Sequence, residues 1–266
     1  KFSMPGMMDT ILNLGLNGPC AEGLARASGD RPFALESYRR LVAMFGAVVR
    51  GVPKERFEAV RVPDPETALS RTLEAYRREA GRDFPADPRA QLSAAVEAVF
   101  RSWDNARAVV YRKANGIPED LGTACTVQAM VFGNRGPASG TGVGFTRDPA
   151  TGRRVPYGEY LPDAQGEDVV AGVRTPMPLA ELRRALPAVH RRLLAVTGGL
   201  ERRLKDAQDY EFTVERGRLY LLQTRAAKRT AAAALRMAVD MTRERLIGRE
   251  EALRVAFEVG NRHFTL

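Results

Sequence analysis

The sequence has 266 residues, which is enough for one large or two modest domains with a hydrophobic core. Its hydrophobic fraction of 44% and charged fraction of 27% are typical of a soluble globular protein, and no apolar run is long enough to predict a membrane span. The formal charge of +9 fits a phosphate-rich ligand or an acidic partner, whereas arginines spread along predicted helices, without interleaved aromatics, argue against nucleic-acid binding.

The chain opens at Lys1 without an initiator methionine and without a basic and apolar leader. We therefore expect it to be part of a longer, cytoplasmic protein. Residues 1–19 contain a Pro-Gly turn and an apolar run, which predict a loop followed by a short helix or an extended segment. Cys20 and Cys125 are far apart and lack metal-ligand spacing, so we expect reduced, buried thiols rather than a disulfide.

Residues 20–113 have a helical pattern. Apolar residues recur at helical spacing over 34–49, and Asp64 and Asp87, each followed by proline, are typical helix starts. A further helical stretch covers 109–113. The sequence predicts a subdomain of three or four amphipathic helices. Its exposed cations are interpreted as solvated side chains: Arg39, Arg40 and Arg107.

The composition changes near Gly122. Residues 123–132 predict a strand, residues 133–142 form a Gly-rich segment, and residues 143–146 predict a second strand. A flexible loop between two strands is one way for a backbone to approach phosphates, because glycine allows close contact and positive φ. The same pattern also fits a plain hairpin linker, and it is neither a Walker A loop nor a GxGxxG motif that opens a helix.

The following stretch predicts a strand over 157–161 and a long helix over 179–197. His190 lies among arginines in that helix and is interpreted as a surface residue, not a catalyst. Residues 226–266 predict an Ala-rich helix and then a more charged one.

Residues 208–225 predict a β-hairpin, because two runs rich in β-branched and aromatic residues flank Arg216-Gly217. Alternation places Asp209, Glu211 and Thr213 on one face of the first strand. Two carboxylates on one strand face suit Mg²⁺ held between protein and phosphate oxygens. The alternative is a solvated acidic edge.

The register of this hairpin decides between the two interpretations. With a two-residue loop Glu211 would face Leu222, whereas a three-residue loop with a Gly bulge would make it face Gln223. Only the second arrangement gathers Glu211, Gln223 and Arg225 on one face. We predict the three-residue loop.

Three long stretches together resemble the pyruvate phosphate dikinase family, in its nucleotide-binding domain of ATP-grasp type. They are FSMPGMMDTILNLG at Phe2–Gly15, GTGVGFTRDPATG with YGEYLPDAQGEDVVAGVRTP up to Pro176, and QDYEFTVERGRLYLLQTRAAKRT at Gln208–Thr230. The segment Trp103-Asp104-Asn105 is also similar to that family. Pro162-Asp163 is a small departure from the family pattern.

The resemblance implies an α+β fold, an ATP-grasp-type domain with a mostly antiparallel sheet and an inserted helical subdomain. It implies four regions: 1–19, a remnant of the first ATP-grasp subdomain; 20–113, the helical subdomain; 114–230, the β-rich nucleotide-binding region; and 231–266, a helical linker toward a phosphohistidine domain. Family members convert ATP, phosphate and pyruvate to AMP, pyrophosphate and phosphoenolpyruvate through a phosphorylated histidine on a swivelling domain. The full-length enzyme is expected to be a cytoplasmic homodimer.

The resemblance also implies residue roles. Asp209, Glu211 and Gln223 would hold nucleotide, with Glu211 and Gln223 as Mg²⁺ ligands, and Arg225 would face the phosphates. Gln128 and Met130 would lie along the adenine. A loop is expected to cover the triphosphate: Ser139, Gly140, Thr141, Gly142 and Val143.

Three further positions match less central parts of the family site. Arg40 matches an arginine implicated in the ATP reaction, and Glu159 and Arg107 match positions at which the swivelling domain docks. The family's lysine and arginine that contact ATP phosphates would precede Lys1, and neither His190 nor His263 has the Thr-Ser-His context. We therefore expect this polypeptide by itself to lack full turnover.

Three alternatives remain open at the level of sequence. They are a non-catalytic nucleotide-binding or interaction module, a phosphoenolpyruvate synthase-type paralogue, and a basic nucleic-acid-binding domain.

Overall fold

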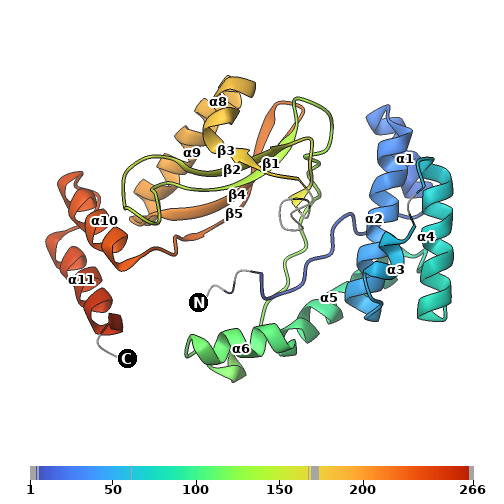
Figure 1. Ribbon diagram of the computed structural model, residues 1–266, viewed down its shortest axis with the longest axis horizontal. Coiled ribbons are helices and arrows are strands. Elements are labelled where there is room, and N and C mark those ends of the chain that lie inside the picture. The colour runs from blue at the N-terminus through green and yellow to red at the C-terminus, as the bar shows by residue number, and fades with distance from the viewer. Residues whose placement is uncertain (1–3, 5, 61, 167, 169–173, 264–266) are drawn as a thin grey trace. The chain divides into compact units, whose positions relative to one another are not determined.

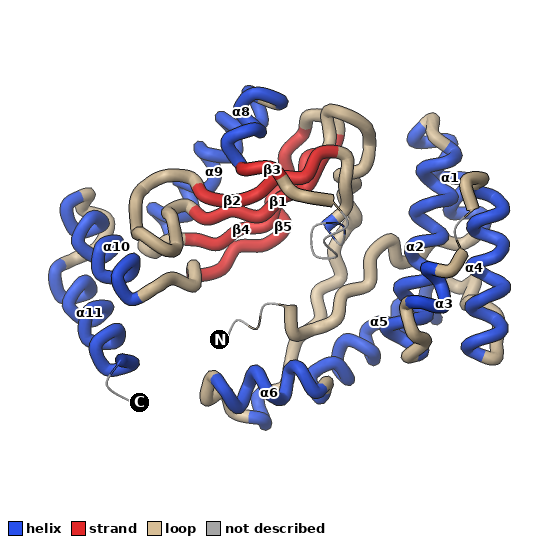
Figure 2. Tube along the Cα trace, viewed as in Figure 1, coloured by secondary structure: helices blue, strands red, loops and turns tan. Residues whose placement is uncertain are grey.

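The computed structural model describes residues 4, 6–60, 62–166, 168 and 174–263. The chain divides into two compact units, unit 1 (Lys1–Met130) and unit 2 (Val131–Leu266), whose elements are labelled in Figure 1 and distinguished by type in Figure 2. Parts of the motifs that carry the family resemblance, residues 2, 3, 5, 167 and 169–173, lie outside the described residues. None of the described helices is long and apolar enough to cross a membrane.

Unit 1 is helical, as predicted for 20–113. Its elements are α1 (Gly18–Ser28), α2 (Arg31–Arg50), α3 (Glu55–Glu58), α4 (Pro65–Ala80), α5 (Pro88–Arg101), η1 (Ser102–Asp104), α6 (Ala106–Ala114) and η2 (Glu119–Leu121). The two predicted helix starts are confirmed, because the Asp64 and Asp87 side chains accept hydrogen bonds from the first-turn amides of α4 and α5. α1 and the short α3 were not predicted.

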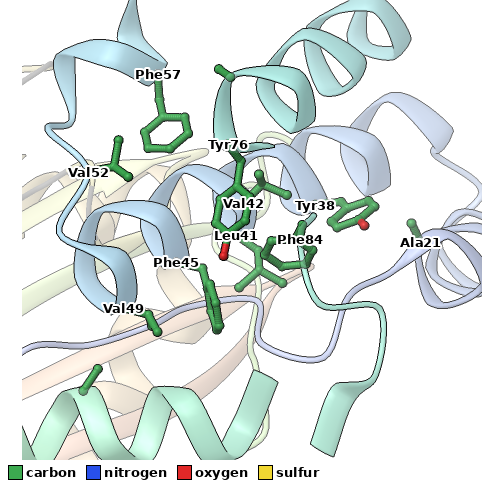
Figure 3. Packing of buried hydrophobic residues seen from close by; sticks show 12 residues of the cluster. Ala21, Tyr38, Leu41, Val42, Phe45, Val49, Val52, Phe57, Tyr76 and Phe84 are labelled. Atoms are coloured by element: carbon green, nitrogen blue, oxygen red, sulfur yellow. The ribbon is translucent and has the colours of Figure 1, made fainter. Parts of the chain in front are cut away.

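The core of unit 1 is an aromatic cluster between α2 and α4 (Figure 3). The Phe84 ring has its centroid 5.8 Å from that of Tyr38, 5.3 Å from that of Phe45 and 5.4 Å from that of Tyr76, in edge-to-face geometry. The opening segment also belongs to this unit, since its apolar residues pack on the cluster: Ile11, Leu14 and Leu16.

Three expectations for unit 1 are wrong. Residues 123–132 form no strand; they are irregular, and Val127 is 67% exposed, because none of the described strands pairs with them to receive the β-branched side chains. Cys20 and Cys125 are free thiols as predicted, but Cys20 is exposed and Cys125 only half-buried. Arg39 and Arg40 are not solvated, because both pair with Glu36 and keep less than a quarter of their side chains exposed.

Unit 2 is built on a sheet whose described strands run in the order β3-β2-β1-β4-β5, each antiparallel to its neighbour. The strands are β1 (Gly140–Phe145), β2 (Tyr157–Pro162), β3 (Met177–Pro178), β4 (Gln208–Glu215) and β5 (Arg218–Ala226). The prediction of an α+β fold with a mostly antiparallel sheet is confirmed.

Helices cover one face of this sheet (Figure 1). Between β3 and β4 lie η3 (Leu179–Glu181), α8 (Leu182–Ala185) and α9 (Pro187–Leu204); α10 (Ala231–Arg243) and α11 (Arg249–His263) follow β5. The helix predicted over 179–197 is broken at Leu186, because residues before proline avoid helical dihedrals. α9 then continues through Gly198 and Gly199, past the predicted end.

The covered face carries the aromatic residues of the strands. Tyr160, Tyr210, Phe212 and Val214 pack there against Leu182, Val189 and Leu193 of α8 and α9. The glycines of β1 make room for the rings. A Cβ on Gly140 would lie 2.5 Å from the Tyr160 ring, and one on Gly142 would lie 2.7 Å from the Phe212 ring.

The β4–β5 hairpin joins its strands through a two-residue turn. Glu215 pairs with Arg218, and Arg216 and Gly217 have φ of 49° and 79°, as a type I′ turn requires. The predicted three-residue loop is therefore wrong. The expected pairing of Glu211 with Gln223 is nevertheless present, because a register shift beside Glu211 leaves Leu222 as an extra residue in β5.

Candidate functional site

A row of side chains crosses the face of the sheet that α8 and α9 do not cover, here called the site face. Val143 of β1 pairs with Glu159 on one side and with Glu211 on the other, and Glu211 pairs in turn with Gln223 of β5. Directly paired residues project to the same face, so the four side chains form one line across four strands. Glu159 and Gln223 are exposed, and Val143 and Glu211 are half-buried.

A second pair lies one step along the same strands. Asp209 pairs with Arg225, and the Asp209 carboxylate accepts a hydrogen bond of 2.7 Å from Nε of Arg225. A second guanidinium nitrogen of Arg225 lies 3.8 Å from the Glu211 carboxylate. Asp209 is 9% exposed, and its ion pair with Arg225 holds the Arg225 guanidinium beside Glu211. The expected register already places Asp209 opposite Arg225, but the sequence interpretation did not draw this ion pair from it.

Both ends of the site face are filled. Thr141, Leu161 and Thr213 are almost completely buried, and the Thr141 hydroxyl donates to the Phe212 carbonyl. At the other end Phe145 packs against the cluster of α10. The accessible part is therefore the row of Glu159, Val143, Glu211 and Gln223 with Arg225 beside it.

The Gly-rich segment does not form the expected loop over this row. Gly140–Val143 belong to the central strand β1, and Ser139 is fully buried, where its hydroxyl accepts a hydrogen bond from the Arg216 amide. The glycines look like a flexible loop in sequence, but they serve ring packing within the sheet. The irregular part covers residues 131–139 and is held by hydrogen bonds. The Gly136 amide donates to the Asp163 carboxylate, and the Ala164 amide donates to the Gly133 carbonyl.

Four other predicted residues belong to unit 1. Gln128 is exposed and Met130 half-buried in the irregular segment that ends that unit. Arg40 of α2 pairs with Glu36 at 3.2 Å. Burial raises the pKa of Glu36, but the hydrogen bonds and charges of Arg39 and Arg40 outweigh it, and the net pKa is lowered. Arg107 of α6 donates to the Met7 carbonyl and pairs with Asp9.

The donor set of the site face fits a hard cation. Glu211 offers a carboxylate and Gln223 an amide oxygen, whereas Asp209 is occupied by Arg225. Two carboxylates stand against one guanidinium, so the cluster keeps a net negative charge that a divalent cation would offset. Among the described residues, no group of three or more His, Cys, Asp or Glu side chains could hold a metal by itself. Any Mg²⁺ here would therefore need further oxygens, from a bound ligand or from water.

A buried ion cluster behind the site was not predicted. Arg147, fully buried after β1, donates to Glu201 of α9 at 2.9 Å and to Glu244, which follows α10, at 2.7 Å. It ties the strand to both helices. The sequence shows only an arginine before Asp148-Pro149, and no spacing rule connects it with Glu201 or Glu244.

The family model of the pyruvate phosphate dikinase AMP/ATP-binding domain matches residues 1–192. The pyruvate, phosphate dikinase of Clostridium symbiosum is 51% identical over 270 residues, covering 95% of this chain. That of Rhizobium meliloti (strain 1021) is 48% identical over 281 residues, again 95% of this chain. Pyruvate, phosphate dikinase 1, chloroplastic, of Arabidopsis thaliana is 46% identical over 270 residues, 96% of this chain.

The chain spans 31% of the length of the two bacterial relatives and 28% of the plant relative. The match extends over both units, because the alignments cover at least 95% of this chain. This chain therefore belongs to the pyruvate phosphate dikinase family and corresponds to its AMP/ATP-binding domain.

Proposed function

We propose that the site face of unit 2 binds Mg-ATP, with Glu211 and Gln223 toward the metal and Arg225 toward the phosphates. The observation that carries the proposal is the cross-strand pairing of Glu211 with Gln223, with the Arg225 guanidinium 3.8 Å from Glu211, on a sheet face free of α8 and α9. Phosphoryl transfer needs positioning and charge neutralisation more than covalent work by side chains, and this set supplies both.

Each residue has a distinct task in this proposal. Glu211 and Gln223 offer oxygen ligands, and bound Mg²⁺ would neutralise phosphate charge. Arg225 contributes a fixed positive charge, because Asp209 holds its guanidinium at 2.7 Å. Val143 forms an apolar floor between the two acidic strands.

The wider assignments are proposals that rest on the family. The domain is of ATP-grasp type, Gln128 and Met130 lie along the adenine, and Arg40 assists the ATP reaction. In a homodimeric, cytoplasmic enzyme, phosphoryl groups pass from ATP to a histidine on a swivelling domain that docks near Glu159 and Arg107, and on to pyruvate. The exposed position of Glu159 in the row of Glu211 supports this docking. The comparisons do not favour a non-catalytic module or a phosphoenolpyruvate synthase-type paralogue.

Hydrogen exchange with millimolar Mg-ATP tests where the nucleotide binds. We expect slower exchange of the amides of β4 and β5, lost when Mg²⁺ is chelated. Glu211→Gln keeps the size of the side chain but removes its charge, and should weaken binding by about tenfold or more, the cost of losing an interaction with a charged group. Glu250→Gln on α11, at an exposed position, is the matched control and should bind like the unaltered chain.

Two results would contradict the proposal. One is Mg-ATP protection that spares β4 and β5 while it appears elsewhere. The other is a Glu211→Gln chain that is protected at the same nucleotide concentration as the Glu250→Gln chain.

A further inference from the structure

The positive charge of the chain is concentrated on one helical segment. Residues 182–205 carry seven basic residues and one acidic residue, a formal charge of +6 out of the +9 of the whole chain. The basic residues are Arg183, Arg184, Arg191, Arg192, Arg202, Arg203 and Lys205, and all are exposed. The acidic one, Glu201, is buried and bound to Arg147, so it does not offset the charge of the outer surface.

Most of these arginines have no carboxylate beside them among the described residues. Within the described part of the chain, Arg184 pairs with Glu181 at 3.0 Å, and the other five have no ion pair. Four exposed arginines of unit 1 do lie within 4.0 Å of a carboxylate: Arg56, Arg77, Arg78 and Arg101. Neighbouring like charges repel one another, so a solvated surface alone gives no reason to gather them.

The arginines of α9 also occur at a regular spacing along the helix. Arg191 and Arg202 are eleven residues apart, which brings them to the same side of the helix about three turns, roughly 16 Å, from each other. Arg192 and Arg203 repeat this spacing. The residues between them on that side are small: Ala195, Gly198 and Gly199.

The Arg202 side chain is all that lies close to the two glycines among the described residues. A Cβ on Gly198 would meet nothing closer than the Arg202 side chain at 3.5 Å, and on Gly199 the same side chain at 3.9 Å. Glycine inside a helix costs about 1 kcal/mol relative to alanine. Only the long Arg202 side chain occupies the space beside these glycines, so another backbone could come close where that side chain turns aside to pair with a carboxylate.

We propose that the outer side of α9 is a docking surface for an acidic α-helical protein segment, whose carboxylates pair with Arg191/Arg192 at one end and Arg202/Arg203 at the other. Guanidinium groups bind carboxylates in a bidentate manner, and the small residues between the pairs let a helix lie close. Residues 182–205 contain no aromatic side chain for stacking on bases. They also expose only Leu204 among their large apolar residues, which is too little for insertion into a lipid surface.

This surface is distinct from the nucleotide site. α8 and α9 pack on the covered face of the sheet, whereas Glu211, Gln223 and Arg225 lie on the site face. Docking on α9 therefore leaves the site face accessible.

The test uses the full chain and a fluorescein-labelled helical peptide with glutamate pairs eleven residues apart, followed by fluorescence anisotropy. R191Q/R192Q/R202Q/R203Q should weaken binding by about tenfold or more, because four exposed ion pairs are lost. The control R56Q/R77Q/R78Q/R101Q removes the same charge from exposed arginines of unit 1 and should change the affinity by less than about twofold. Binding to the unaltered chain should weaken as salt rises.

Equal weakening by both quadruple variants would show a general charge effect and overturn the proposal. So would unchanged binding by the α9 variant. Tighter binding of single-stranded DNA, or of phosphatidylserine vesicles, through the same four arginines would assign the surface to another class of partner. Circular dichroism melts of both variants establish that they fold.

Discussion

Two buried tyrosines of the covered face differ in what their hydroxyl groups meet. Tyr160 and Tyr210 are each 1% exposed, and both lie over glycines of β1. The Tyr160 hydroxyl donates to the Ser139 carbonyl at 3.2 Å, whereas the Tyr210 hydroxyl has no hydrogen-bond partner among the described residues. A buried polar group without a hydrogen bond costs free energy, and a bonded one contributes about 1 kcal/mol.

We therefore predict opposite effects for the same substitution. Tyr160→Phe should lower the free energy of unfolding by about 1 kcal/mol. Tyr210→Phe should leave it unchanged or raise it, because only an unpaired hydroxyl is removed. Urea unfolding followed by circular dichroism measures both. If Tyr210→Phe lowered the free energy of unfolding as much as Tyr160→Phe does, the Tyr210 hydroxyl would have a hydrogen-bond partner.

The buried cluster of Arg147 makes a pH-dependent contribution. Burial raises the pKa of Glu201, but the hydrogen bond from Arg147 and its charge outweigh this and lower the pKa below its usual 4.5. A carboxyl group with a lower pKa in the folded state stabilises the fold above its unfolded pKa. That stability is lost as the pH falls through the folded pKa, so the relevant range lies below pH 4.5.

Glu201→Gln should change both the free energy of unfolding at pH 7 and its dependence on pH. At pH 7 it should cost about 3–5 kcal/mol, because Arg147 loses one of its buried counter-charges. Between pH 7 and pH 3, the free energy of unfolding should then fall less steeply with decreasing pH than it does for the unaltered chain. Glu181→Gln, in the exposed pair with Arg184, is the control and should have little effect. If the free energy of unfolding of the Glu201→Gln chain fell at acidic pH as steeply as that of the unaltered chain, the pH dependence would not come from Glu201.

At the scale of elements, the hairpin of β4 and β5 shows what alternation can and cannot predict. The faces of β4 follow from its sequence, because side chains alternate strictly along a strand. The position of the bulge does not follow, since a residue can be inserted at the turn or inside β5 with the same pairing of Glu211 and Gln223. The sequence thus predicts the site pair but misplaces the extra residue.

Cysteine pairs can test this register. In a chain with Cys20 and Cys125 replaced by serine, Glu211→Cys with Gln223→Cys should form a disulfide in air, because directly opposite residues are at the right separation. Glu211→Cys with Leu222→Cys should stay reduced, since Leu222 is the unpaired residue. Mass spectrometry after thiol alkylation distinguishes the two forms. Ready oxidation of the second pair in place of the first would show that the register is the regular one.

Other elements show where sequence patterns mislead. The glycines at 140, 142 and 144 suggest a mobile loop, but their alternation is that of a strand under aromatic rings supplied by β2 and β4. That reason lies in residues distant in the sequence. Residues 123–132 have the opposite problem, because their composition favours a strand but no strand in the described part of the chain pairs with them. Helix starts at Asp64 and Asp87 were predictable because capping is local.

At the scale of the whole molecule, the two units have separate hydrophobic cores. Leu41 lies in the core of unit 1 and Leu193 in that of unit 2, and both are fully buried. The only tryptophan, Trp103, lies in unit 1, where Arg112 stacks 4.0 Å from its ring centroid. Its fluorescence therefore reports on unit 1, whereas hydrogen exchange in β1, β4 and β5 reports on unit 2.

Each core should respond to its own substitution. Leu41→Ala and Leu193→Ala should each cost about 2–5 kcal/mol, the usual range for a cavity left by a buried leucine. Leu41→Ala should lower the urea midpoint of Trp103 fluorescence and leave exchange in the strands nearly unchanged. Leu193→Ala should speed strand exchange without moving the fluorescence midpoint. If Leu193→Ala moved that midpoint as far as Leu41→Ala does, the two cores would unfold as one cooperative structure, and the separate contact networks of the units would not correspond to separate folding units.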